Sequence, residues 1–188
     1  MPSLCHSSYR SQDQRNSEIH SRVTKLNKSD TFTPHNQKKI VVLGVGNLLL
    51  SDEGIGVHVV NKLMEMALPP EVEVIEGGIY GLGLMNVVMG AERLIVIDAV
   101  RGGGPPGSIY QFNIEELTTY PDVYKMSVHE ISILEVIRLS GLVGRTPKTT
   151  VIGVEPKSLE TGMELSPEIQ AKVPRIIELI LDELKHSA

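Results

Sequence analysis

The sequence contains no tryptophan, a single cysteine and few aromatic residues, and each shortage excludes a class of function. Aromatic side chains make up 4% of the 188 residues, so a surface that stacks nucleic-acid bases is not expected. Cys5 is the only cysteine, which excludes disulfide-bonded scaffolds and thiolate metal clusters within this chain. A body without cysteine is typical of a reducing compartment, and we expect a cytoplasmic protein.

Long hydrophobic runs are also missing. The longest apolar stretch, near residues 40–50, is interrupted by two glycines and Asn47 and is too short to cross a bilayer. The N-terminal region lacks the apolar central segment of a secretory signal. We therefore expect no membrane association.

Basic residues are scarce outside the N-terminal region. Residues 1–39 contain seven Lys or Arg against three Asp or Glu, and the remaining 149 residues contain 11 basic and 20 acidic side chains. A general binder of phosphate backbones needs a basic face, so no nucleic-acid partner is expected. Residues 1–38 are polar and show no apolar period, which predicts a disordered basic tail rather than the alternative, a transit peptide. Residues 39–188 then form a single α/β domain.

Hydrophobic patterning predicts alternating strands and helices after residue 39. Nearly continuous β-branched runs predict strands buried on both faces at residues 39–45 and 93–100. Further strands are predicted at 72–75, 108–112 and 149–154. Apolar residues at helical spacing predict helices at 54–66, 82–89 and 128–139, and Met66 is expected on the apolar face of the first of these. A last helix is predicted to be capped by Ser166. Pro174 predicts a kink or break near Val173.

This alternation predicts a three-layer α/β/α domain around a mixed five-stranded sheet. The Gly/Pro loop at residues 102–107 is too short for a parallel crossover, so strand 108–112 is expected to run antiparallel to strand 93–100. Ligands of such sheets bind beyond the carboxyl ends of the strands. Three predicted loops with polar residues lie there: Asn47 to Glu53, Glu76 to Tyr80, and Asp98 to Gly104.

The glycines after the first strand suggest a dinucleotide site, but the fingerprint is incomplete. Gly44-Val-Gly46 is followed by Leu49 at the position of the third glycine. Asp52 and Glu53 would repel a pyrophosphate in the same loop. A nucleotide-binding α/β protein is therefore the weaker alternative.

What remains is a group of acidic residues at the predicted strand ends. We interpret Asp52 as a capping acid of the first helix, whereas the apolar residues beside Glu53 suggest that its side chain is partly buried. Asp98 closes a buried strand at the ligand-binding rim, where a functional role is expected as readily as a structural one. His129 lies at the start of a predicted helix, where a cap or a packing residue is the commoner role. Two carboxylates and an imidazole can hold a divalent cation with open positions, but their separation in the sequence does not show that they meet.

The run Gly44-Val-Gly-Asn-Leu-Leu-Leu-Ser-Asp-Glu-Gly-Ile-Gly56 resembles the opening motif of the hydrogenase maturation proteases. These endopeptidases trim the C-terminus of the large subunit of nickel–iron hydrogenases. The resemblance covers about residues 39–186 and continues, in order, through Glu76-Gly-Gly78, Val96-Ile-Asp-Ala99, Ser127-Val-His-Glu130, Val151-Ile-Gly-Val-Glu-Pro156 and Leu165-Ser-Pro167.

This resemblance implies a phosphorylase/hydrolase-like fold, with Glu53, Asp98 and His129 as the residues that contact nickel. The nickel would be supplied by the hydrogenase large-subunit precursor rather than held permanently, and the protease would act as a monomer. Family members commonly carry Asp where this chain has Glu76, which we leave out of the ligand set. Asp98 is the candidate catalytic residue if a carboxylate acts as the base, and nickel-assisted hydrolysis is the other route. A non-enzymatic nickel-dependent checkpoint that binds the precursor is the remaining alternative.

Overall fold

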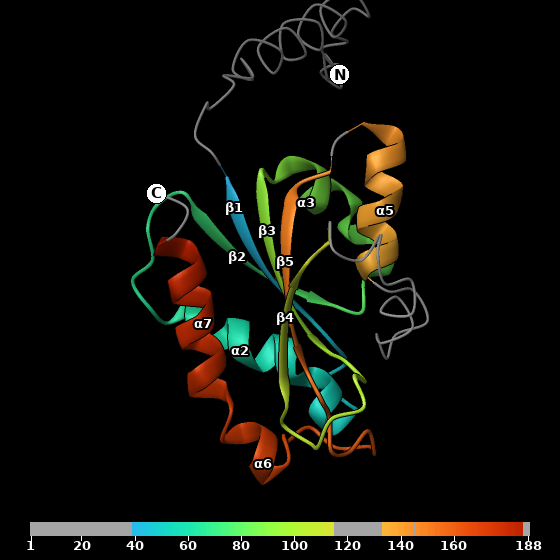
Figure 1. Ribbon diagram of the computed structural model, residues 1–188, viewed down its shortest axis with the longest axis vertical. Helices are drawn as coiled ribbons and strands as arrows, with labels where there is room; N and C mark the ends of the chain where they lie inside the picture. The colour runs from blue at the N-terminus through green and yellow to red at the C-terminus, as the bar shows by residue number, and fades with distance from the viewer. Residues whose placement is uncertain (1–38, 115–132, 145, 186–188) are drawn as a thin grey trace, which may run out of the picture. The chain divides into compact units, whose positions relative to one another are not determined.

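The structure is a computed structural model that describes residues 39–114, 133–144 and 146–185. The predicted N-terminal tail at 1–38 lies outside the described residues, as does His129. The chain folds around a five-stranded sheet (Figure 1). The strands lie in the order β2-β1-β3-β5-β4 and comprise β1 (Ile40–Val45), β2 (Val72–Gly78), β3 (Arg93–Ala99), β4 (Ile109–Asn113) and β5 (Lys148–Val154).

Strand direction agrees with the expectation from the short Gly/Pro loop. Strand β1 pairs in parallel with β2 and β3, and β3 pairs in parallel with β5. Strand β4 pairs antiparallel with β5, with Ile109 opposite Val154. The prediction of one antiparallel strand in a mixed sheet is confirmed, and that strand lies at the edge beside β5 rather than beside β3.

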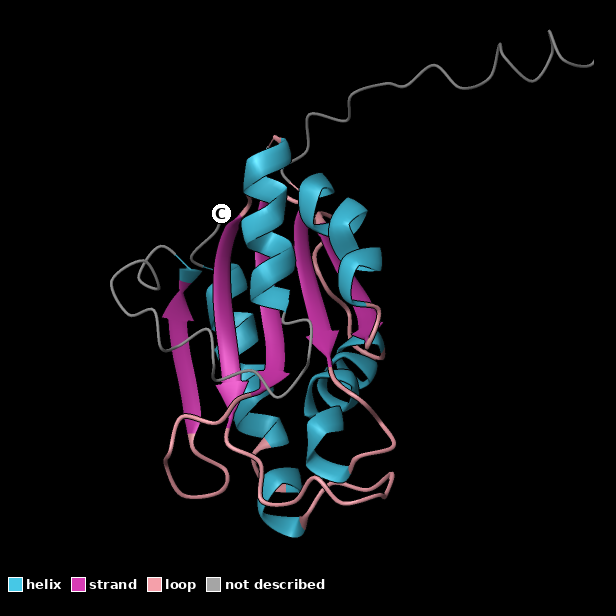
Figure 2. Ribbon diagram, turned by 90° about the vertical axis from the view of Figure 1, so that its right-hand side faces the viewer, coloured by secondary structure: helices cyan, strands magenta, loops and turns pink. Residues whose placement is uncertain are grey.

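Helices cover both faces of the sheet (Figure 2). One face carries α2 (Ile55–Met64), α6 (Pro167–Gln170) and α7 (Val173–Lys185), and the other carries α3 (Met85–Gly90) and α5 (Ile133–Val143). Two 3₁₀ helices, η1 (Ser51–Gly54) and η2 (Gly81–Leu84), precede α2 and α3.

The alternation of side chains along β1 separates two buried clusters. Val42 belongs to the cluster under α2 and α7, whereas Val41 and Leu43 belong to the cluster under α3 and α5. Every residue of β1 is buried, as its β-branched sequence predicts. The three-layer architecture is confirmed, and each fully buried aliphatic side chain stabilises it by about 1.5–3 kcal/mol.

Several predicted boundaries differ from the structure. Helix α2 ends at Met64, so Met66 is exposed rather than on the apolar face of the helix. The predicted helix at 82–89 begins as η2, and β2 extends to Gly78. The break expected near Val173 is present, because α6 and α7 are separate helices. Pro174 lies in the first turn of α7, where a missing N–H removes no intrahelical bond.

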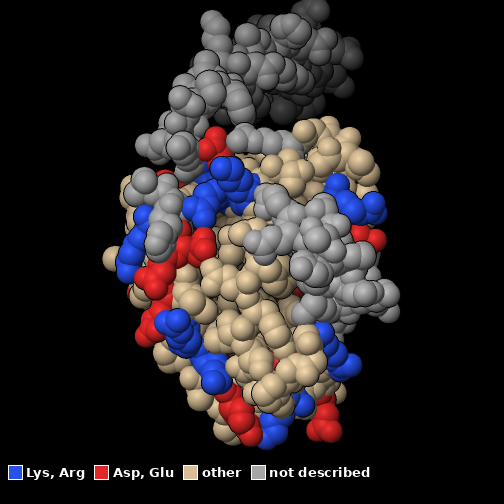
Figure 3. Space-filling model, in the orientation of Figure 1, with Lys and Arg blue, Asp and Glu red and all other residues tan. Residues whose placement is uncertain are grey.

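Charges of both signs are interspersed on the face shown in Figure 3. Basic and acidic side chains both occur along α6 and α7, where Arg175 pairs with Glu178 and Lys185 with Asp182. Glu168 of α6 pairs with Lys157 of the loop after β5. This mixture is unlike the basic face that a phosphate-backbone binder needs. Within the described parts of the chain, no helix combines the length and apolarity needed to cross a membrane.

Candidate functional site

The parallel strands β1, β2, β3 and β5 end at the same edge of the sheet, and the candidate site lies there. Three connections meet at this edge. We name them the 46–54 loop after β1, the 100–108 loop after β3 and the 155–166 loop after β5. Glu53 belongs to the first of these, and Asp98 lies near the end of β3, just before the second.

Glycines allow the 46–54 loop to pack closely against the ends of the strands. Gly46 has φ +140, and a Cβ added to it would lie 1.9 Å from the backbone oxygen of Glu53. In a dinucleotide site, a glycine at the same place has no side chain and so lets the backbone approach a pyrophosphate. Here it lets the carbonyl of Glu53 pack against the end of β1.

A second glycine places the start of α2 beside Asp98. A Cβ on Gly56 would lie 2.3 Å from the backbone oxygen of Ile97, the residue before Asp98. Glu53 precedes Gly56 by about one helical turn, and η1 packs against β3. The structure therefore brings Glu53 and Asp98 to the same corner of the sheet.

Both carboxylates are buried. Glu53 is 6% exposed and Asp98 is 2% exposed. The Oδ1 atom of Asp98 accepts a hydrogen bond from the N–H of Ala99 at 2.8 Å. Leu94 and Val96 face α3 and α5, so the alternation of β3 directs Asp98 toward the same layer. Burial of carboxylates at a ligand-binding edge is common where they bind a cation or transfer a proton.

The third predicted ligand, His129, lies outside the described residues, so the proposed triad stays a prediction. Across residues 39–114, 133–144 and 146–185, no three His, Cys, Asp or Glu side chains cluster closely enough to hold a metal ion. Glu76, which we left out of the ligand set, is exposed on edge strand β2.

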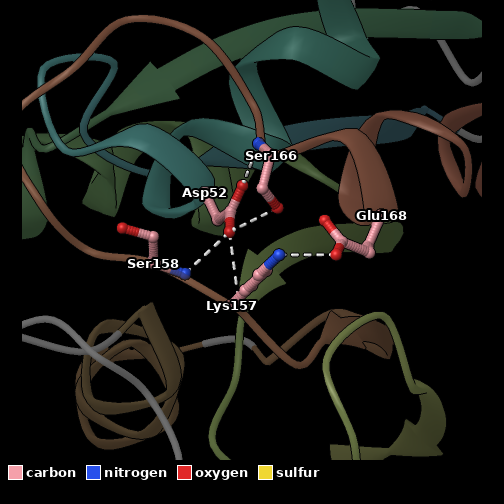
Figure 4. Close-up of polar contacts among 5 residues, drawn as sticks. All are labelled: Asp52, Lys157, Ser158, Ser166 and Glu168. Atoms are coloured by element: carbon pink, nitrogen blue, oxygen red, sulfur yellow. Dashed lines mark hydrogen bonds and ion pairs between the residues drawn. The ribbon is translucent and has the colours of Figure 1, made fainter.

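Asp52 does not cap its own helix as we expected. Neither η1 nor α2 has a side-chain cap, and Asp52 is fully buried. Its carboxylate instead accepts hydrogen bonds from the 155–166 loop (Figure 4). The structural role expected for Asp52 therefore holds, but the groups it binds are far away in the sequence.

Ser166 also departs from its prediction. It occupies the N-cap position of α6, but its hydroxyl donates to Asp52 Oδ2 at 2.9 Å and makes no capping bond. Its backbone oxygen accepts from the N–H groups of Ile169 and Gln170. The side chain thus joins the start of α6 to η1.

The sequence analysis missed Glu155, which holds the 100–108 loop. Its Oε2 accepts from the N–H of Gly102 at 2.7 Å and from the hydroxyl of Tyr110 at 2.8 Å. The Tyr110 oxygen in turn accepts from the N–H of Gly104 at 2.9 Å. Burial raises the pKa of Tyr110, and the hydrogen bond to Glu155 raises it further. The only signal in the sequence was a carboxylate directly after a buried strand, in the motif shared with the resembling family.

Comparison with known proteins identifies the family to which the chain belongs. A family model described as "Hydrogenase maturation protease" matches residues 57–183. The chain belongs to the hydrogenase maturation protease family. The matched span contains Asp98 and His129 and begins shortly after Glu53.

Individual relatives agree with this assignment. The chain is 38% identical over 150 residues to "Hydrogenase expression/formation protein HupD" of Bradyrhizobium diazoefficiens, covering 78% of each chain. It is 36% identical over 154 residues to "Hydrogenase 2 maturation protease" of Escherichia coli, covering 79% of this chain and 92% of the relative. The solved hydrogenase maturating endopeptidase HybD of E. coli superposes with a TM-score of 0.73 at 34% identity, covering 80% of this chain and 94% of that one.

Membership of this family makes the protein a hydrogenase maturation endopeptidase. Its relatives are proteases that process hydrogenase, which supports the same processing role for this chain. The resemblance described from the sequence is thereby confirmed.

Proposed function

We propose that this hydrogenase maturation protease removes a C-terminal peptide from the nickel-loaded large-subunit precursor of a nickel–iron hydrogenase. The observation that supports the proposal is the presence of two buried carboxylates, Glu53 and Asp98, at one corner of the ligand-binding edge. Charged oxygens kept out of bulk water interact more strongly with an incoming cation than solvated ones do.

Nickel in this proposal belongs to the substrate. Two carboxylates together with the imidazole of His129 offer oxygen and nitrogen ligands, which suit a borderline divalent cation. The precursor's own cysteines would complete the coordination. Glu53, Asp98 and His129 would then contact nickel only in a precursor that already carries it, so metal insertion would precede cleavage.

Asp98 is the proposed catalytic residue. As a general base it accepts a proton from a water molecule while the water oxygen bonds to the carbon of the scissile carbonyl. The C–N bond then breaks, and the proton passes to the leaving amine. Nickel of the precursor offers the other route, because a metal polarises a carbonyl oxygen directly.

The proposal is tested with purified precursor in nickel-loaded and nickel-free forms. Each form is incubated with the protease, and the mass of the large subunit is measured. We expect loss of a C-terminal peptide from the loaded form alone. Equal cleavage of both forms contradicts recognition of nickel, and precursor binding without any change in mass contradicts the proposed cleavage.

We also propose that the enzyme works as a monomer in the cytoplasm. The cysteine-free body fits a reducing compartment. Light scattering on the purified protein at micromolar concentration is expected to give the 20.6 kDa mass of one chain, and a stable mass of twice that value contradicts the monomer.

A further inference from the structure

We propose that Asp52 is a positioning residue whose carboxylate fixes Glu53 at the site by joining η1 to the 155–166 loop. The inference rests on the proposed function, because Glu53 is assigned its role there. It concerns a different side chain, one that would touch neither the substrate nor its metal.

The first observation is the number of donors that converge on Asp52 (Figure 4). Its Oδ2 accepts from the N–H of Lys157 at 3.0 Å, from the N–H of Ser158 at 2.9 Å and from the hydroxyl of Ser166 at 2.9 Å. Its Oδ1 accepts from the N–H of Ser166 at 2.7 Å. Hydrogen bonds to a charged acceptor are about twice as strong as neutral ones, so this carboxylate is a strong link between the two loops.

The second observation is the backbone of the neighbouring residue. Ser51 has φ +48, in the left-handed region that a serine rarely adopts. Two contacts with the 155–166 loop hold it there: its N–H donates to the oxygen of Gly162 at 2.8 Å, and its hydroxyl donates to the oxygen of Glu160 at 2.9 Å. Such a conformation persists only where the surroundings enforce it, and Ser51 is the first residue of η1.

The third observation is the position of Glu53 itself. Its carbonyl packs against Gly46 with no room for a Cβ between them. The N–H of Asp52 donates to the oxygen of Ser158 at 3.2 Å, so the peptide between Ser51 and Asp52 is also held by the 155–166 loop. Glu53 is therefore fixed between the end of β1 and the 155–166 loop, and Asp52 supplies most of the bonds on the loop side.

An asparagine at this position cannot replace the carboxylate. Each oxygen of Asp52 faces at least one backbone N–H, so either orientation of an amide would set its NH₂ group against a backbone donor. The nearby ion pair between Lys157 and Glu168 provides a matched control. Both of its side chains are about half exposed at 48%, and the pair does not involve Asp52.

The test compares Asp52→Asn, Glu168→Gln and the core variant Ile180→Val by cleavage kinetics and hydrogen exchange. We expect Asp52→Asn to lower kcat about tenfold and to change KM less than threefold, because the contacts with the precursor remain. Amide exchange of the peptides covering 49–54 should accelerate, while exchange of β1 and α7 stays unchanged. Glu168→Gln and Ile180→Val should keep kcat within twofold of the wild type.

The outcomes separate this inference from the proposed function. If the wild type does not cleave the loaded precursor, the proposed function fails. If the wild type cleaves but Asp52→Asn loses no more kcat than Ile180→Val, or loses it without faster exchange at 49–54, the positioning role is overturned.

A second pair of variants serves if Asp52→Asn does not fold. Ser166→Ala removes one donor to Asp52 without removing a helix cap, and Ser166→Thr keeps the hydroxyl. We expect kcat to fall about threefold in the alanine variant and to return to within 1.5-fold of the wild type in the threonine variant, on the order expected for one charged hydrogen bond weakened in a network. Equal kcat in the two variants contradicts the inference.

Discussion

The 46–54 loop and the 100–108 loop are held in place in the same way, but by different numbers of hydrogen bonds. Each is held by one buried carboxylate that accepts hydrogen bonds across the strand ends, Asp52 in the first case and Glu155 in the second. Asp52 accepts four bonds, three of them from backbone N–H groups. Glu155 accepts one backbone N–H directly and reaches a second through the hydroxyl of Tyr110.

This difference divides the acidic residues of the site into two kinds. Asp52 and Glu155 support loops, whereas Glu53 and Asp98 are the carboxylates proposed to meet the substrate. The 155–166 loop takes part in both supports, because it supplies the donors to Asp52 and begins with Glu155. The loop that carries Glu53 should therefore be the more rigid of the two, and variants in it should cost more free energy of unfolding.

The largest loss of stability is expected when the two supporting carboxylates are truncated. Asp52→Ala leaves three backbone N–H groups without their acceptor and should lower the free energy of unfolding by about 4 kcal/mol. Glu155→Ala removes fewer bonds from a less enclosed loop and should cost about 2 kcal/mol. Urea denaturation of both variants measures the difference, and an equal cost would remove the distinction between the loops.

The next largest loss of stability is expected at one of two glycines with positive φ. A Cβ at Gly46 would collide with the Glu53 carbonyl, so Gly46→Ala should lower the free energy of unfolding by at least about 3 kcal/mol. Gly103 has φ +81 but nothing within 4 Å of an added Cβ, so Gly103→Ala should cost only about 1 kcal/mol of backbone strain. Thermal unfolding compares the two, and a larger loss at Gly103 would show that the crowding around Gly46 is relieved cheaply.

The smallest effect is expected for Tyr110→Phe, which removes the hydroxyl between Glu155 and Gly104 and should cost about 1 kcal/mol. The pKa of Tyr110 is raised in the folded state, by burial first and by Glu155 second. The stabilising contribution of the Tyr110 hydroxyl is therefore present at pH values below its pKa in the unfolded chain. It is lost as the pH rises through its pKa in the folded protein. The stability difference between wild type and Tyr110→Phe should shrink above about pH 10, and a difference that grows there would contradict the sign of the shift.

The sequence predicted the parts of the fold that depend on local pattern. The buried runs of β1 and β3, the antiparallel β4 and the break at Pro174 all follow from side-chain periodicity, loop length and proline chemistry. The motifs also marked Glu53 and Asp98, and both lie buried at the predicted edge.

What could not be predicted depends on contacts between distant segments. Asp52 followed the rule for a capping acid, yet its partners lie more than 100 residues away, and no local pattern encodes them. Glu155 and Gly102 are likewise far apart in the sequence, separated by 53 residues. Met66 kept the helical period, but the backbone leaves the helix at Met64, and propensity alone does not set that boundary.

The division between reacting and supporting carboxylates is tested most directly by cleavage of nickel-loaded precursor with Asp98→Asn and Glu155→Gln, compared at equal concentrations of folded enzyme. Both variants exchange a carboxylate for an amide of the same shape at the same edge. The account predicts that Asp98→Asn lowers kcat by about 100-fold or more, while Glu155→Gln stays within about fivefold of the wild type. Retained cleavage in Asp98→Asn, or an equal loss in both variants, would contradict it.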